Sequence, residues 1–163
     1  MTNKAEGRAS KNPAPHSSIL VLGVGNILLS DEGVGVRVVE AIKEMKLPDD
    51  VELLDGGTGA FDLLNVMADR EKVIIIDAVK GGGEPGTIYR LSPEDIRMKK
   101  QHLTSVHQMS LPDTLAIAKI SGCAPRDVVI YGIEPKRLDW GLELSPEVAA
   151  VVPRVMELIV REL

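Results

Sequence analysis

Lys72-Val-Ile-Ile-Ile-Asp77 is the stretch of sequence that decides the fold. Four consecutive β-branched residues followed by an acid are typical of a strand that is covered on both faces, as in a parallel sheet between helices. A strand with one face in water would alternate apolar and polar residues instead. This stretch therefore predicts the central strand of a buried parallel sheet.

Short apolar runs alternate with amphipathic stretches on both sides of this segment, and no internal repeat is present. This order is typical of βα units in a doubly wound layer. The predicted fold is a single α/β domain, a three-layer sandwich with a twisted, mostly parallel sheet and helices on both faces. The other strands are expected at 19–23, 51–54, 87–91 and 128–133, and helices at 34–45, at Leu63 to Val66, from Ser92 and from Ser145.

Prolines complicate two of the expected helices. Ser105 with Gln108 resembles a capping box, but Pro112 would fall inside a helix that began there. Such a helix is either kinked near Pro112 or begins afresh at Ser110. The C-terminal helix carries Pro153 within its apolar pattern, so this helix is expected to bend.

Composition limits the kind of protein. A chain of 163 residues is the size of one domain, and with 2% aromatic residues its core must consist of aliphatic side chains. The net charge of −5, without a basic cluster beside aromatics, argues against a nucleic-acid partner. The single cysteine, Cys123, excludes an internal disulfide and a multi-cysteine metal site, and we interpret it as packing in a protein of a reducing compartment.

The N-terminal segment, residues 1–18, is polar and lacks the apolar stretch of a signal peptide. We expect it to be a disordered tail, which leaves 19–163 as the folded domain. No apolar run is long enough to span a bilayer. The sequence therefore predicts a cytoplasmic protein without membrane insertion.

Polar candidates for chemistry follow the strands of the predicted sheet. Asp31 and Glu32 close the loop after the first strand, Asp77 ends the central strand, and His107 lies at the head of a later helix. Ligands of open α/β sheets gather at the carboxyl ends of the strands. Two carboxylates and a neutral imidazole balance a divalent cation and suit nickel, zinc or manganese. Each also has a structural interpretation, such as an acid that stabilises a helix start.

Two other kinds of site are weaker interpretations. Gly23-Val-Gly25 begins like a dinucleotide-binding loop, but the third glycine would fall at Leu28, and the two acids that follow would repel a phosphate. A serine hydrolase is not indicated, because no G-x-S-x-G motif is present.

Five motifs in order give a more specific indication. They are Gly23-Val-Gly-Asn-Ile-Leu-Leu-Ser-Asp-Glu-Gly-Val-Gly35, Asp55-Gly-Gly-Thr58, Ile75-Ile-Asp-Ala78, Ser105-Val-His-Gln108 and Gly132-Ile-Glu-Pro135. Together they resemble the hydrogenase maturation endopeptidases, from Ile19 to the C-terminus. The resemblance implies a twisted sheet between helices. It also implies that Glu32, Asp77 and His107 contact a metal, with Asp55 as a candidate supporting residue.

The activity implied by this resemblance is that of a metal-dependent endopeptidase, of the aspartyl protease class. It would cut the C-terminal peptide from the large-subunit precursor of a [NiFe] hydrogenase after nickel insertion. Its metal would be nickel contacted in that precursor, with zinc or cadmium as other cations for the site. No general base is assigned, and the metal could polarise the scissile carbonyl or activate water. The alternatives are a relative that cuts another precursor and a noncatalytic nickel-binding or small-ligand module.

Overall fold

The computed structural model describes residues 18–58, 63–98, 104–105 and 111–163. The predicted tail lies outside these residues apart from Ser18, whose carbonyl oxygen accepts hydrogen bonds from the backbone N–H groups of Glu71 and Lys72. Within the described part, no helix is long and apolar enough to cross a membrane.

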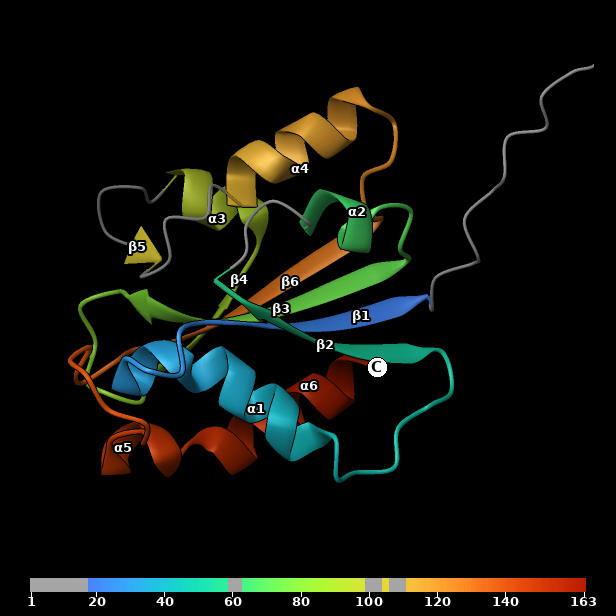
Figure 1. Cartoon of the computed structure of the whole chain (residues 1–163). Coiled ribbons are helices and arrows are strands. Elements are labelled where there is room, and N and C mark those ends of the chain that lie inside the picture. The colour runs from blue at the N-terminus through green and yellow to red at the C-terminus, as the bar shows by residue number, and fades with distance from the viewer. Residues whose placement is uncertain (1–17, 59–62, 99–103, 106–110) are drawn as a thin grey trace, which may run out of the picture.

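A mostly parallel sheet forms the middle layer, with the central strand where the sequence predicts it (Figure 1). The spatial order of the strands is β2 (Val51–Gly57), β1 (Ile19–Val24), β3 (Lys72–Lys80), β6 (Asp127–Ile133) and β4 (Ile88–Leu91). The first four of these strands are parallel to one another, and β4 is antiparallel to β6. A short strand, β5 (Thr104–Ser105), pairs antiparallel with the end of β3.

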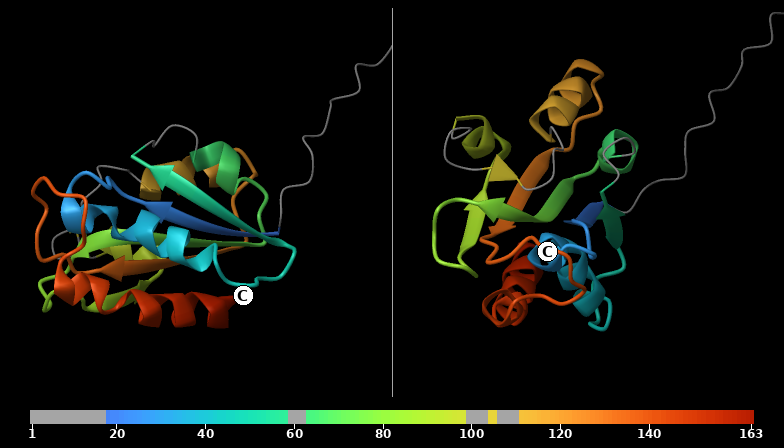
Figure 2. Two further views of the ribbon diagram at one scale, coloured as in Figure 1. Left: turned by 60° about the horizontal axis from the view of Figure 1, so that its bottom comes forward. Right: turned by 60° about the vertical axis from the view of Figure 1, so that its left-hand side comes forward.

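Helices cover both faces of the sheet, as Figures 1 and 2 show. One face carries α1 (Val34–Ile42), which follows the 3-10 turn η1 (Ser30–Gly33), together with α5 (Pro146–Ala149) and α6 (Val152–Glu162). The other face carries α2 (Leu63–Met67), α3 (Pro93–Met98) and α4 (Leu111–Ile120). The predicted three-layer α/β fold is therefore confirmed.

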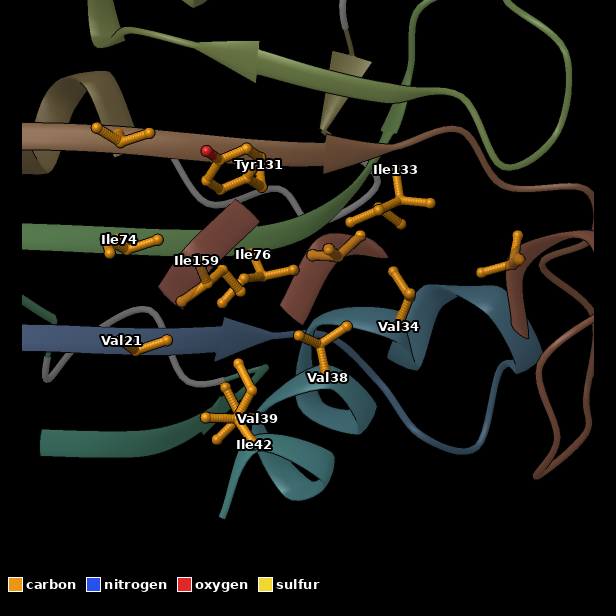
Figure 3. Packing of buried hydrophobic residues seen from close by; sticks show 14 residues of the cluster. Val21, Val34, Val38, Val39, Ile42, Ile74, Ile76, Tyr131, Ile133 and Ile159 are labelled. Atoms are coloured by element: carbon orange, nitrogen blue, oxygen red, sulfur yellow. The ribbon is translucent and has the colours of Figure 1, made fainter. Parts of the chain in front are cut away.

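Two apolar clusters hold the three layers together. Along β3, Ile74 and Ile76 pack toward α1 and α6 (Figure 3). Ile75 packs toward α2 and α4 on the other face. All three side chains are buried, which explains why this strand has no polar alternation. Each side chain of this kind contributes roughly 1.5–3 kcal/mol by leaving water.

Two strands are longer than expected. β3 continues past Asp77 because Ala78 pairs with Ile133 and the next two residues pair with β5. β2 continues through the predicted break at Asp55, because Asp55 pairs with Gly23 of β1 in the parallel ladder. Asp55 and the two glycines after it therefore form the end of strand β2 and not a loop.

The helix boundaries bear on the questions raised by proline. Helix α4 is described from Leu111, and Ser105 pairs with Val79 in β5. The choice between a kinked helix and a fresh start at Ser110, and the capping box of Ser105 with Gln108, depend on residues 106–110, which lie outside the described residues. The predicted C-terminal helix is two helices, with Pro153 in the first turn of α6, where its missing N–H is not needed.

Glu162 at the end of α6 links this helix to three strands. Its carboxylate accepts hydrogen bonds from Arg90 Nε at 2.7 Å, Lys72 Nζ at 2.9 Å and the Tyr131 hydroxyl at 3.0 Å. The hydrogen bond from Arg90 is the largest cause that lowers the pKa of Glu162 from 4.5 to about 2. Because the folded pKa lies below the unfolded value, this stabilisation is complete above pH 5 and is lost as pH falls toward 2.

Replacing Glu162 by glutamine should therefore lower the free energy of unfolding at pH 7 by about 1–2 kcal/mol. The difference from the wild type should shrink as pH falls from 5 toward 2. Urea unfolding at several pH values measures both effects. Glu157→Gln is the matched control, since Glu157 lies on the same helix and its salt bridge with Arg154 is exposed. Equal destabilisation by both changes would contradict the role of Glu162.

Candidate functional site

The carboxyl ends of β1 and β3 form the switch point of the sheet. The chain leaves β1 toward β2 on one side, whereas it leaves β3 toward β4 on the other side. In open α/β sheets, the crevice between two such strands is the usual place for a ligand. The left-hand edge of the sheet in Figure 1 is this end, where η1 and β5 also lie.

Asp77 lies directly at this switch point. The last residue pair between β1 and β3 joins Gly23 and Ile76, so Asp77 is the first residue of β3 beyond its pairing with β1. On its other side it still pairs with Gly132 of β6, and its side chain is 7% exposed. By alternation along the strand, the carboxylate is on the face covered by α2 and α4.

Glu32 reaches the same edge from the loop after β1. It lies in η1, which packs against β3, and it is 9% exposed. Glycines permit this close approach: a Cβ on Gly25 would lie 2.1 Å from the carbonyl oxygen of Glu32, and one on Gly35 would lie 2.2 Å from that of Ile76. Contacts this short exclude any side chain, so the glycines of the first motif allow the loop that carries Glu32 and the start of α1 to pack against β3, with Gly35 at Ile76, the residue before Asp77.

Asp31 has a structural role that the sequence does not separate from that of Glu32. Its side chain is fully buried, and its carboxylate accepts four hydrogen bonds from the loop after β6. The donors are the backbone N–H groups of Lys136 (2.9 Å), Arg137 (3.0 Å) and Ser145 (2.7 Å) and the Ser145 hydroxyl (2.8 Å). The loop that contains Asp31 and Glu32 is therefore attached to the neighbouring loop, 136–145, through the Asp31 carboxylate.

His107, the third predicted ligand, lies outside the described residues. The described strand β5 ends two residues earlier at Ser105, which pairs with Val79, two residues beyond Asp77. Helix α4 is described from Leu111, and residues 106–110 lie outside the described residues, so the helix start that was expected to keep His107 neutral stays a prediction. Among residues 18–58, 63–98, 104–105 and 111–163, no three His, Cys, Asp or Glu side chains form a possible metal site.

Asp55, the candidate supporting residue, is exposed at the end of β2, two strands away from Asp77. Its Oδ1 accepts a hydrogen bond of 2.8 Å from the N–H of Gly57. Leu53, two residues earlier, packs toward α1, so alternation places Asp55 on the opposite face of the sheet from Asp77. In the described structure, Glu32 and Asp77 thus lie at the carboxyl ends of the central strands, whereas Asp55 lies apart from them on the other face of the sheet.

Glu134 is a further buried acid at this edge. One oxygen of its carboxylate accepts hydrogen bonds from the N–H of Gly81 at 2.6 Å and the hydroxyl of Tyr89 at 2.8 Å. These bonds fix the turn between β3 and β4, and they account for the acid in the fifth motif. Glu134 and Asp77 follow the same sequence pattern, an acid after a run of apolar strand residues. The hydrogen bonds of Glu134 with Gly81 and Tyr89, however, serve the fold.

Comparison with known proteins identifies the family. The family model for hydrogenase maturation proteases, HycI, matches residues 36–162. The chain belongs to the hydrogenase maturation protease family. A relative from Escherichia coli, the hydrogenase 2 maturation protease, is 42% identical over 147 residues, which cover 89% of this chain and 90% of the relative.

Solved structures of maturation proteases share the fold. The endopeptidase HybD from Escherichia coli matches with a TM-score of 0.81 and 41% identity, over 89% of this chain and 91% of that one. HybD from Thermococcus kodakarensis, titled a [NiFe] hydrogenase maturation protease, matches with a TM-score of 0.74 and 31% identity, over 88% of this chain and 97% of that one. This maturation protease is therefore a peptidase, which favours the main functional hypothesis over a noncatalytic nickel-binding or small-ligand module.

Cys123 of this maturation protease is not near the crevice. It is half-buried in the turn after α4, and its carbonyl oxygen accepts a hydrogen bond from the N–H of Asp69, which precedes β3. Both positions lie at the amino ends of the parallel strands, opposite Asp77. This placement agrees with the interpretation of Cys123 as packing.

Proposed function

We propose that this maturation protease removes the C-terminal peptide from the large-subunit precursor of a [NiFe] hydrogenase after nickel insertion, and that Glu32, Asp77 and His107 contact the nickel in that precursor. The observation that carries this proposal is the position of Glu32 and Asp77, two buried acids from separate segments, at the switch point of the sheet. We place this reaction in the cytoplasm.

The donor set suits the proposed metal. Two carboxylates with one neutral imidazole carry a charge of −2, which balances a divalent cation, and oxygen and nitrogen ligands suit nickel as well as zinc or cadmium. Histidine with an ordinary pKa near 6.5 is mostly neutral at pH 7, as a metal ligand must be. The short strand β5 supports His107 as the third ligand. It ends at Ser105, two residues before His107 in the sequence, and it pairs with β3 just beyond Asp77.

Three protein ligands do not close the coordination shell of a divalent cation, so further ligands would come from the precursor. The protease would then distinguish a nickel-containing precursor from an empty one by a difference in binding free energy. When held in this way, the nickel would polarise the scissile carbonyl or lower the pKa of a bound water. Glu32 and Asp77 would anchor and orient the nickel, while Asp55 supports the end of β2 by accepting a hydrogen bond from Gly57.

Intact-mass analysis tests the proposed activity. The purified chain is incubated with nickel-loaded large-subunit precursor, and the precursor should lose the mass of one C-terminal peptide. An unchanged precursor mass would contradict the proposal and would favour a relative that cuts another precursor.

Binding of nickel should stabilise the folded protease, because the proposed ligands come together only in the fold. At a free nickel concentration of 100 times Kd, binding should raise the free energy of unfolding by about 2.7 kcal/mol, which corresponds to a rise of roughly 5–10 °C in Tm. His107→Ala should remove most of this rise, whereas His102→Ala, a histidine outside the proposed site, should keep it. Differential scanning fluorimetry with and without nickel measures the shift. A full nickel shift in the His107 variant would exclude His107 from the site.

A further inference from the structure

An exposed apolar patch lies on the loops next to the proposed site. The described residues include seven exposed large apolar side chains, and three of them gather on two loops: Trp140 (80% exposed), Leu142 (63%) and Leu28 (46%). Trp140 is the single tryptophan of the chain. Large exposed apolar side chains that cluster on a surface mark interaction sites more often than single ones do.

Hydrogen bonds between the two loops hold this patch together. Gly141, between Trp140 and Leu142, donates its N–H to the carbonyl oxygen of Leu28 at 3.0 Å and accepts from the N–H of Ser30 at 2.8 Å. The Ser30 hydroxyl also donates to the carbonyl oxygen of Asp139 at 3.0 Å. The three apolar residues therefore lie on adjacent backbone segments, although more than 100 residues separate Leu28 from Trp140 and Leu142 in the sequence.

The loop after β6 is fixed at further points around the patch. Arg37 of α1 donates from Nη2 to the carbonyl oxygen of Leu142 at 2.9 Å, and the carboxylate of Asp31 holds the backbone at Lys136, Arg137 and Ser145. A loop fixed in this way loses little conformational entropy when a partner binds. The patch is thus a preformed surface and not a flexible loop with an incidental tryptophan.

The position of the patch indicates its partner. Leu28 precedes Glu32 by four residues in one loop, and Asp31, directly before Glu32, holds the other loop. Figures 1 and 2 show both loops side by side at the carboxyl edge of the sheet. A partner on the patch would therefore lie next to the proposed cleavage site.

We propose that Trp140, Leu142 and Leu28 form the docking surface for an apolar face of the large-subunit precursor. The inference rests on the proposed function and extends it, since it adds a contact that does not depend on nickel. Arg137 and Asp139 lie on the same loop as Trp140, and Arg37 donates to the carbonyl oxygen of Leu142, so charged side chains adjoin the apolar residues as in the polar rim of a protein interface. Tryptophan is among the residues that most often dominate binding energy in such interfaces.

Nickel-free precursor is the probe for this surface, because it is expected to dock without being cleaved. Trp140→Ala should raise the Kd for this precursor at least about 10-fold, measured by biolayer interferometry, whereas Trp140→Phe should stay within about 3-fold of the wild type. Ile120→Ala is the matched control, since Ile120 is 88% exposed on α4 over the opposite face of the sheet. Its Kd should equal that of the wild type.

Three outcomes would overturn the docking surface. The first is an unchanged Kd in a Trp140→Ala, Leu142→Ala double variant, and the second is an equal rise in Kd in the Ile120→Ala control. The third is a wild-type dimer in light scattering that Trp140→Ala dissociates, because the patch would then bind a second copy of this chain. The proposed function fails by a separate result, which is that the wild type releases no peptide from nickel-loaded precursor.

Discussion

Replacing Asp77 by asparagine is expected to reduce the cleavage of nickel-loaded precursor by more than about 100-fold, because even residues that only orient a metal ligand commonly contribute 10–100-fold. Asparagine keeps the size of the side chain but removes the charge that would hold the cation. The fold should survive, so the far-ultraviolet circular dichroism of the variant should match that of the wild type. Release of the C-terminal peptide, followed by intact mass over time, measures the loss.

Asp113→Asn provides the control for this change. Asp113 is an exposed acid on α4, which covers the face of the sheet that Asp77 occupies, and its replacement should leave cleavage unchanged. If the Asp77 variant cuts the precursor at the wild-type rate, the crevice between β1 and β3 is not the active site. If it is inactive and unfolded, Asp77→Ser and Asp77→Glu separate the loss of charge from the loss of packing.

Asp31→Ala is expected to lower the free energy of unfolding by about 3–5 kcal/mol, because it leaves the N–H groups of Lys136 and Arg137 and the buried donors of Ser145 without their acceptor. A loss of this size is a large part of the 5–15 kcal/mol that stabilises a typical domain. Urea unfolding at pH 7 measures it. Cleavage should fall as well, since Asp31 fixes the loop that carries Glu32.

Asp49→Ala is the comparison for Asp31, because Asp49 is an exposed acid in the turn before β2. Its replacement should change stability by less than about 0.5 kcal/mol. A similar small effect at Asp31 would contradict its role as the link between the two loops.

The sequence predicts the layers of this fold well because they depend on local patterns. The apolar run before Asp77 could only be a strand with both faces covered, and β3 is the central strand. The boundaries depend on pairing with distant segments, and the local sequence does not contain this information. β2 therefore continues through Asp55, and Ser105 belongs to the short strand β5.

The site is less predictable for a related reason. Asp31 and Glu32 are adjacent acids in one motif, and both are buried. Only the structure assigns the first to the loop after β6, because its four donors lie more than 100 residues away in the sequence. Trp140 and Leu28 likewise become one surface only through the backbone contacts of Gly141. His107 as a ligand remains a prediction from its motif.

Comparison of two forms of the precursor tests the central claim most directly. The purified protease is mixed with large-subunit precursor prepared with and without nickel, under identical conditions, and release of the C-terminal peptide is followed by intact mass. Nickel-loaded precursor should be cut once near its C-terminus, while nickel-free precursor should remain intact. Equal cleavage of both forms would contradict recognition of nickel through Glu32, Asp77 and His107.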